Sequence, residues 1–435
     1  MNQQLSIFTK LINGIRHPKS FAVLFTLVII VSIVVVTRAN RSQIDLAYVI
    51  GNGDRHDKLA YISQDDQLIL YDPVERIENA LLDNVSGFVL SRDGRVAFTK
   101  LDDNDLYVFD TTQPDNDPIN ISQTHDVFEY PLAWSPNGRY LAFGSFTESS
   151  GYPPNIWIYQ GSYTSDSEGL SLYVWDGETN INAMPDQPLD RVDNARVDWS
   201  HNGQLAFTLE HSWSEDDVPA EIYLWDGHNT TNISQNPNGY DGGAQWSNDG
   251  KLLFGSHRGN EEGVFVWDGT SFANGVPDAS TFIQIAPELQ PTRVTWTEDS
   301  LVAFVVYTDT TIPAKTLIQW DTESQAIVKE MPVSSQNAWS WLAEGGQVIL
   351  SSHLASGIPS VYLDVENTAG EIVFSEHVGE FAWSASGYLA FCGIEERYSR
   401  LLSIWNGEES WIVARTSYRP GQWQNGDKVF SCNNG

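Results

Sequence analysis

The sequence is short of the residues on which most recognisable active sites are built. It has two cysteines and three methionines in 435 residues, so a cysteine-based zinc site of the common spacing is excluded. It also lacks the Gly-x-Ser-x-Gly elbow of serine hydrolases, the His-Glu-x-x-His helix of zinc proteases and the Gly-x-x-x-x-Gly-Lys phosphate loop. We therefore predict no catalytic residue and no metal-binding residue.

Basic residues are scarce and unevenly placed. Four of the 24 lysines and arginines lie at or before Arg38, whereas all 57 aspartates and glutamates lie at or after Asp45. The part of the chain after Arg38 therefore has a net charge of −37. A surface of this sign repels nucleic acid, so we predict no nucleic-acid partner. It attracts basic proteins or divalent cations, or it simply keeps the protein soluble in a crowded or saline exterior.

Only one long apolar run occurs, at residues 20–37, and it contains no charged residue. As a helix it would be about 27 Å long, enough to cross a hydrocarbon core. A cleaved signal peptide is the alternative, but its apolar region is usually shorter. The basic, acid-free leader at residues 1–19 places the N-terminus in the cytoplasm. We predict a single-pass protein of the cell membrane, with a linker at residues 38–44 and an extracytoplasmic domain at residues 45–435.

A motif recurs along this domain: an aromatic residue, a tight turn and a short apolar strand. The clearest copies are PLAWSPNGRYLAF from Pro131, RVDWSHNGQLAF from Arg196, AQWSNDGKLLF from Ala244 and FAWSASGYLAF from Phe381. The separations of 40 to 65 residues indicate a repeat architecture. The eight predicted anchors are Phe88, Trp134, Trp199, Trp246, Trp296, Trp341, Trp383 and Trp423.

Each repeat has the composition of a small sheet. Hairpin-forming turn residues follow the anchor, a third strand ends in WDG at Gly177 and Gly227, and a short fourth segment follows. We predict an all-β fold, a single β-propeller of four-stranded blades after one N-terminal transmembrane helix. Pairing of the C-terminal strands with the N-terminal ones in a composite blade gives eight blades and hides both edges. Seven blades result if residues 46–72 pack differently.

The turn motif, followed by IYxWDG, resembles the repeats of the TolB-like (WD40-like) β-propeller family. The resemblance covers roughly residues 45 to 435. WD-repeat proteins are a nearby rival, but their Gly-His pair before the first strand is missing here. The resemblance implies a fold and no particular function, because the separate N-terminal α/β domain of TolB has no counterpart in this chain.

Several isolated features each have two readings. Cys392 and Cys432 lie in equivalent strands of consecutive repeats. They either form a disulfide or are two small buried residues. We predict no cofactor. The acidic runs at residues 102–105, 115–117 and 215–217 are interpreted as solvated turns, with calcium binding as the alternative. His257 and His353 occupy equivalent positions in their repeats, and His211 lies one position further on in its own repeat. These histidines are either metal ligands or loop residues repeated by duplication. Asn-x-Ser/Thr sequons stand at Asn84, Asn120, Asn229 and Asn232.

The longest spacing, 65 residues from Trp134 to Trp199, contains an aromatic-rich insertion from Phe146 to Ser171. Long loops on rigid scaffolds commonly carry binding sites, and exposed tyrosine and tryptophan commonly anchor interfaces. We predict a partner-binding face that collects this insertion, the Trp213 loop and the loops of His257, Tyr307, His353 and Tyr398. The predicted partner-binding residues are Tyr152, Trp157, Tyr159, Tyr163 and Trp213. The alternative is an insertion that folds back on its own blade.

Three functions remain open from the sequence. The first is an extracytoplasmic scaffold that binds a protein or an envelope component. The second is an enzyme, a lyase or glycosidase, with its site at the mouth of the central channel, because carboxylates are abundant. The third is a structural subunit of a surface assembly.

Overall fold

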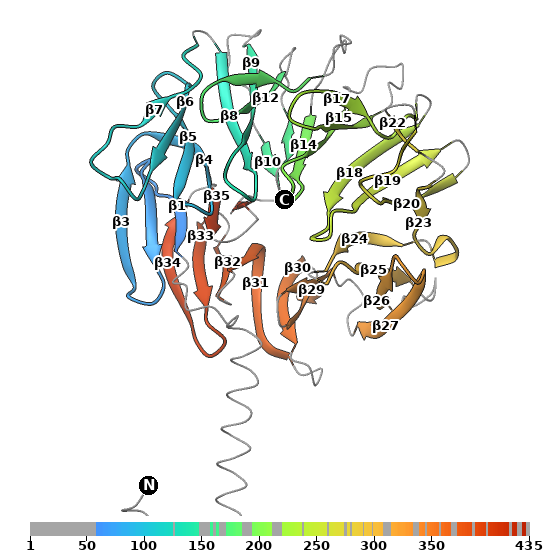
Figure 1. Ribbon diagram of the computed structural model, residues 1–435. Coiled ribbons are helices and arrows are strands. Elements are labelled where there is room, and N and C mark those ends of the chain that lie inside the picture. The colour runs from blue at the N-terminus through green and yellow to red at the C-terminus, as the bar shows by residue number, and fades with distance from the viewer. Residues whose placement is uncertain are drawn as a thin grey trace, which may run out of the picture.

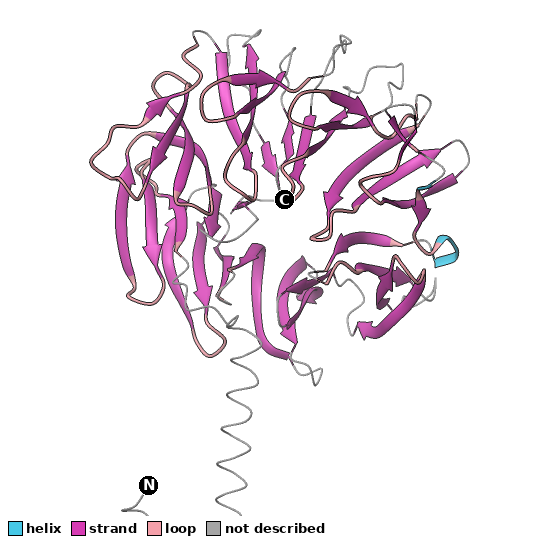
Figure 2. Cartoon of the chain, viewed as in Figure 1, coloured by secondary structure: helices cyan, strands magenta, loops and turns pink. Residues whose placement is uncertain are grey.

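The computed structural model describes residues 58–124, 127–147, 157–159, 162–164, 171–184, 194–210, 220–236, 239–258, 261–273, 276–278, 281–289, 291–297, 299–307, 315–333, 339–343, 346–355, 358–366, 372–384, 388–396, 399–416, 420–423 and 429–431. Within these ranges every regular element is a β-strand except one short 3-10 helix, η2 (Pro287–Leu289). The sheets follow one another around a ring (Figure 1), and strands make up nearly all of the drawn structure (Figure 2). The predicted all-β architecture is confirmed, and the arrangement is that of a β-propeller.

Among the described residues, four sheets have four antiparallel strands in a common order, and the sheet that contains β14–β17 has the same four with two more strands added. In the first half of the chain they are β4 (Val85–Leu90), β5 (Arg95–Lys100), β6 (Leu106–Asp110) and β7 (Ile119–Asn120); then β8 (Val127–Trp134), β9 (Leu141–Thr147), β12 (Ser171–Trp175) and β13 (Asn180–Asn182); then β14 (Asn194–Trp199), β15 (Leu205–Glu210), β16 (Glu221–Trp225) and β17 (Thr230–Asn232). The first strand of each sheet lies toward the inside of the ring and the fourth toward the outside (Figure 1).

The second half continues this order. Its strands are β18 (Tyr240–Trp246), β19 (Leu252–Arg258), β20 (Glu261–Trp267) and β23 (Ile283–Gln284); then β24 (Thr292–Trp296), β25 (Val302–Tyr307), β26 (Lys315–Asp321) and β27 (Ala326–Val333). A two-stranded sheet, β21 (Phe272–Ala273) with β22 (Val276–Pro277), branches off between β20 and β23.

The next sheet has seven strands because two repeats share one strand. Its strands are β28 (Trp339–Ala343), β29 (Gly346–Ala355), β30 (Ile358–Glu366), β31 (Ile372–Trp383), β32 (Leu389–Glu396), β33 (Ser399–Trp405) and β34 (Ser410–Thr416). The first part of β31, to His377, pairs with β30, and the part from Val378 pairs with β32. One continuous strand is therefore the outer strand of one repeat and the inner strand of the next.

The ring closes through strands from both ends of the described chain. β1 (Leu59–Ile62), β2 (Leu68–Asp72) and β3 (Ile77–Leu82) share a sheet with β35 (Pro420–Trp423) and β36 (Val429–Ser431). The closing ladder pairs β1 with β35, including Leu59 with Trp423. This confirms the predicted composite sheet, which leaves neither β1 nor β35 as an open edge.

The tight turn after each first strand has a common hydrogen-bond pattern. The N–H of Ser91 donates to the carbonyl of Arg95, and the N–H of Ser200 donates to that of Gln204. Aligned on this turn, Leu90 occupies the position of Trp134, so the predicted anchor Phe88 was wrong by two residues. The error arose because this repeat has no tryptophan, and residues two apart in a strand point to the same face. Both side chains are buried.

Large aromatic rings join neighbouring sheets. The indole N–H of Trp134 donates to the carbonyl of Val89 in the preceding sheet, and that of Trp199 donates to the carbonyl of Ala133. Tyr140 stacks on Trp199 with ring centroids 5.8 Å apart and meets Trp225 edge-on. Such pairs stabilise a packed junction beyond the area that they bury. The repeated tryptophan is therefore a packing residue at these junctions.

The predicted membrane-spanning segment, residues 20–37, lies outside the described residues. In the part of the chain that the structure describes, no helix is long and apolar enough to cross a membrane.

Candidate functional site at the insertion

Part of the predicted binding insertion forms a hairpin. Trp157 and Tyr159 lie in β10 (Trp157–Tyr159), and Tyr163 lies in β11 (Ser162–Thr164). The two strands pair directly, with Ile158 opposite Tyr163. Only the backbone of these residues is described. Tyr152 and Trp213 lie outside the described residues, so the partner-binding assignment stays a prediction.

The hairpin pairs with a different sheet from the one that it leaves. The chain departs after β9, yet β11 pairs with β14, the first strand of the following sheet, with Tyr163 opposite Ala195. The resulting strand order is β10-β11-β14-β15-β16-β17. The insertion is thus attached to two neighbouring sheets, and its described part is not folded back on its own blade.

This attachment brings the hairpin to the inside of the ring. β14 is the inner strand of its sheet, so strands added to its free edge extend toward the centre. There β10 contacts β36, the last strand of the chain, which also contacts β31. Figure 1 shows β10 near the centre of the ring. Two segments that are far apart in the chain therefore meet on the inner side of the ring.

A buried pair of acidic residues lies at the base of the insertion. Glu129 on β8 is opposite Ser145 on β9, two residues before the last described residue of β9. Glu129 is 1% exposed and Asp105, just before β6, is 6% exposed. The hydroxyl of Thr124 lies 2.6 Å from Glu129 Oε1 and 3.2 Å from Asp105 Oδ1. The amide of Asn120 donates to Asp105 Oδ2 at 2.5 Å.

Burial shifts the pKa of one member of this acidic pair, Glu129. Burial raises the pKa of Glu129 to about 7, and the charges of Asp105 and Asp103 add to the effect. Hydrogen bonds from Thr124 and Ser122 act in the opposite direction. Glu129 Oε2 has no partner within hydrogen-bonding geometry. An isolated buried carboxylate is costly, so this carboxyl favours its protonated form.

A second junction has the same plan. Where the sheet of β14–β17 meets that of β18, Asn232 donates to Glu221 Oε2 at 2.7 Å, as Asn120 does to Asp105. Asp241 occupies the place of Glu129, and its N–H donates to the carbonyl of Ala220 as that of Glu129 donates to Asn104. Asn236 stands where the first junction has Thr124 and donates to Asp241 Oδ1 at 3.3 Å. The two sequons at Asn120 and Asn232 therefore lie in these junctions.

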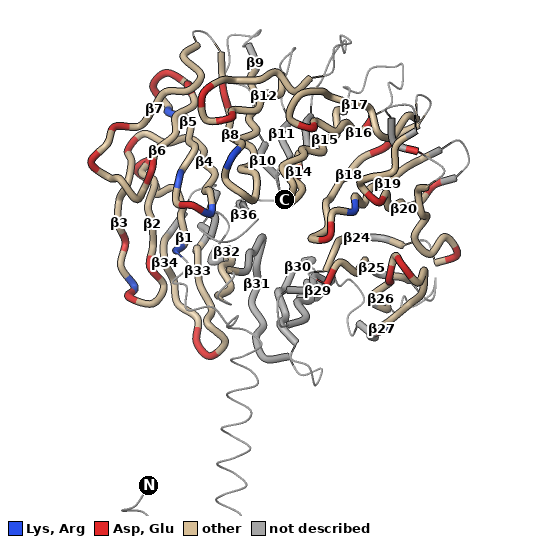
Figure 3. The backbone as a smooth tube through the Cα atoms, viewed as in Figure 1, with Lys and Arg blue, Asp and Glu red and all other residues tan. Residues whose placement is uncertain are grey.

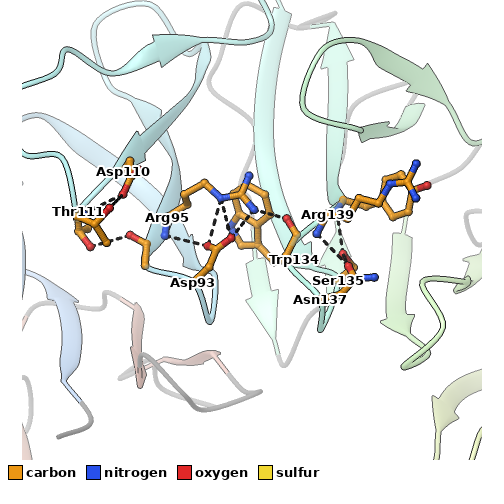
Figure 4. A network of polar contacts seen from close by, with 12 residues as sticks. Asp93, Arg95, Asp110, Thr111, Trp134, Ser135, Asn137 and Arg139 are labelled. Atoms are coloured by element: carbon orange, nitrogen blue, oxygen red, sulfur yellow. Dashed lines mark hydrogen bonds and ion pairs between the residues drawn. The ribbon is translucent and has the colours of Figure 1, made fainter. Parts of the chain in front are cut away.

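The opposite end of the strands carries a different network (Figure 4). Arg95 donates to Asp93 Oδ2 at 2.6 Å and to the carbonyl of Gly138 in the next sheet. Its guanidinium lies 4.6 Å from the centroid of the Trp134 ring. Partial burial raises the pKa of Asp93, but the hydrogen bonds from Arg95 prevail and hold it below the ordinary value. These contacts tie two sheets together, which is a structural role.

The histidines for which metal binding was one reading are described only in part. His257 is exposed at the end of β19, and His353 lies in β29. His211, Tyr398 and residues 215–217 lie outside the described residues. Among the residues that are described, no group of three or more His, Cys, Asp or Glu is placed to hold a metal ion. In the run at residues 102–105, the Asp103 side chain accepts hydrogen bonds from Asp105 N–H and Tyr107 Oη.

Cys392 is fully buried on β32 and is bonded in a disulfide. Its predicted partner, Cys432, lies outside the described residues, so that pairing stays a prediction.

Two residues of this region were not found from the sequence. Nothing in the sequence of β8 distinguishes Glu129 from a surface acid, and only the folded structure shows that it is buried. Tyr240, opposite His257 at the start of β18, is 54% exposed at the same end of the strands as the insertion. The position of Tyr240 after the fourth strand of a repeat is the feature of the sequence that could have indicated an exposed aromatic residue.

Comparisons with known proteins found similarity among solved structures. No family model and no curated protein matches the chain. Among solved structures, prolyl oligopeptidase B from Galerina marginata aligns with a TM-score of 0.50 at 11% identity, over 78% of this chain and 55% of that one. An oligogalacturonate lyase from Vibrio parahaemolyticus has a TM-score of 0.43 at 12% identity, over 74% and 96% of the two chains. TolB from Acinetobacter baumannii has 0.31 at 13%, over 65% of each chain. At these identities the likeness concerns the fold alone. The chain spans about half the length of the oligopeptidase.

Proposed function

We propose that this protein is a membrane-anchored, extracytoplasmic β-propeller that binds a protein or another envelope component. Residues 20–37 form the anchor, with the N-terminus in the cytoplasm. The propeller is TolB-like in its repeats and has eight blades, counting the seven-stranded sheet as two that share β31. No nucleic acid is a partner of so acidic a surface, on which described acidic residues outnumber basic ones (Figure 3).

The attachment of the insertion to two sheets carries this proposal. A free loop loses conformational entropy when a partner orders it, whereas a loop held at both ends has lost much of it already. The hairpin β10–β11 follows β9 in the chain and pairs with β14, so the backbone that carries its aromatic residues is held in a fixed position. A pre-organised patch rich in tyrosine and tryptophan is a common form of protein-binding surface.

The enzyme alternative needs an acid or base that a substrate can reach. Glu129 has a pKa near neutrality, but it is 1% exposed and faces Thr124 within a sheet junction. These observations favour binding over catalysis. If the protein is instead a structural subunit of a surface assembly, it would use the same binding surface, but the complex with its partner would be permanent.

The test begins with native membranes washed in alkaline carbonate, where we expect the full-length chain in the pellet. Affinity capture from detergent then identifies the partner by mass spectrometry, and its affinity is measured for Trp157→Ala and Trp213→Ala. Truncation of a hot-spot aromatic costs about 2 kcal/mol, roughly a thirtyfold loss of affinity. Melting temperatures should stay close to that of the parent.

Val74→Ala is the matched control. Val74 is exposed on the turn between β2 and β3, at the other end of the strands from the insertion. It should bind normally. Normal binding by both tryptophan variants, or a sharp fall in their melting temperatures, would show that these rings pack within the fold and do not meet a partner.

A further inference from the structure

The protonation state of Glu129 decides how the Thr124 hydroxyl is shared between Glu129 and Asp105. With a proton on Oε1, Glu129 donates to Thr124 Oγ1 across 2.6 Å, and the Thr124 hydroxyl donates to Asp105 Oδ1 across 3.2 Å. The side-chain amide of Asn120 donates a hydrogen bond to the other carboxylate oxygen of Asp105, Oδ2. One negative charge is then shared by two buried carboxyl groups, and the Thr124 hydroxyl bridges them.

Loss of that proton leaves the junction short of donors. The single hydroxyl proton of Thr124 serves one carboxylate at a time, so the hydrogen bond from Ser122 is the other side-chain contact that favours ionised Glu129. Oε2 of Glu129 has no partner. Two buried negative charges then stand on either side of one hydroxyl group, which destabilises both.

Among the described side chains, we find no cation that faces Glu129 and could compensate its negative charge. The flanking strands β4 and β9 contain no charged residue, and Asp103 adds a negative charge from the β5–β6 turn. Lys100 lies over the Tyr107 ring, and Tyr107 donates to Asp103. In β14, Asp198 accepts from the N–H of Trp246, and the Arg196 side chain lies outside the described residues. His125 and Asp126, which lead into β8, also lie outside them.

We propose that Glu129, Thr124 and Asp105 form a proton-operated latch at the base of the insertion. Protonated Glu129 holds the ends of β8 and β9 against the β5–β6 turn, and its ionisation loosens those strand ends. The insertion departs from the end of β9, so the latch sets how firmly one of its two attachments is held. The step from the latch to partner binding rests on the proposed function; the latch itself does not.

The direction of the pH effect follows from the raised pKa. The folded carboxyl binds its proton more tightly than a free carboxyl, from an ordinary value of 4.5 to about 7. The latch is therefore fully closed below the ordinary value, weakens as the pH rises between the two values, and is weakest above the higher one. Each unit of separation corresponds to about a tenfold change in the opening equilibrium.

Hydrogen–deuterium exchange of the full-length protein in detergent tests the latch at about pH 5.5 and about pH 8.5, on either side of the titration. After correction for intrinsic exchange rates, protection of β8 (Val127–Trp134) and β9 (Leu141–Thr147) should fall by about tenfold or more at the higher pH. Glu129→Gln, which keeps a donor to Thr124 at every pH, should abolish this fall.

Two further variants keep the test sharp. Thr124→Asn imitates Asn236 of the second junction and supplies an amide donor to ionised Glu129, so the transition should move to lower pH. Glu221→Gln alters the second junction and should leave the transition of β8 and β9 unchanged. A parent protein without the fall in protection, or the same fall in Glu129→Gln, would overturn the latch.

Partner affinity measured over the same pH range separates the two proposals. It should weaken with rising pH in the parent and stay constant in Glu129→Gln. If exchange shows the latch while Trp157→Ala and Trp213→Ala bind normally, the proposed function fails and the latch stands.

Discussion

Single polar side chains set many of the turns in this molecule. Asp176, the aspartate of a Trp-Asp-Gly ending, accepts hydrogen bonds from the N–H groups of Glu178 and Thr179 at 2.9 and 2.8 Å. These backbone hydrogen bonds are the main reason that its pKa lies below the ordinary value. Gly177 completes the turn with φ of 104°, where a side chain would be strained. The motif that resembles a family signature is therefore a local turn-capping device.

Asp176→Ala should destabilise the protein by about 1 kcal/mol, because two backbone N–H groups lose their acceptor, as when a helix N-cap is removed. Asp176→Asn is the control that the chain itself offers. Asn406 makes the same two contacts, with Glu408 and Glu409, in another repeat. Denaturant unfolding measures both, and equal losses in the two variants would contradict the capping role.

At this scale the sequence predicts some roles and not others. The turn glycines and Trp-Asp endings are local, and local chemistry explains them. Glu129 is different, because its pKa depends on burial against a turn 24 residues earlier in the chain and on Thr124. The sequons at Asn120 and Asn232 are similar: the sequence locates them, but only the structure shows that both amides donate to carboxylates within sheet junctions.

At the scale of elements, strand positions were predictable but strand partners were less so. The period of the motif located the strands because each hairpin is formed by neighbours in the sequence. The pairing of β11 with β14 joins segments about thirty residues apart across a sheet boundary, and no local pattern indicates it. The same holds for β31, where the absence of a break between two repeats makes one long strand.

Tyr163→Pro tests the attachment of the hairpin. Tyr163 lies in the middle of β11, between β10 and β14, and proline cannot donate in such a position. We expect faster exchange and faster proteolysis across β10 and β11, with a melting temperature close to that of the parent, since β14 keeps its pairing with β15. Thr316→Pro, in the central strand β26, is a contrasting variant that should unfold its sheet.

Unchanged proteolysis of the Tyr163→Pro insertion would show that β11 does not depend on its pairing with β14. A large fall in melting temperature would show instead that the hairpin is part of the ring's stability. Either outcome would remove the physical basis for a pre-organised binding patch.

At the scale of the whole molecule, the ends of the described chain determine whether the ring is closed. β35 pairs with β1, so the last repeat is completed by strands from the beginning of the domain. Side chains reinforce the same boundary. Trp411 donates to the hydroxyl of Tyr71 at 2.8 Å, and Arg76 lies over the Trp411 ring and pairs with Glu409. Stability of the ring is therefore shared between residues more than 300 positions apart.

Removal of residues 420–435 should open the ring. The deletion takes away β35 and β36, exposes the edge of β1 and uncovers buried residues such as Leu59 and Tyr61. An exposed apolar strand edge promotes association between chains. We expect a strongly lowered melting temperature and higher oligomers by size-exclusion chromatography in detergent. Removal of residues 433–435 alone keeps both strands and Cys432, and should leave the protein monodisperse to the same degree as the parent. A 420–435 deletion that melts and elutes like the parent would show that the sheet containing β1, β2 and β3 is stable without its C-terminal strands.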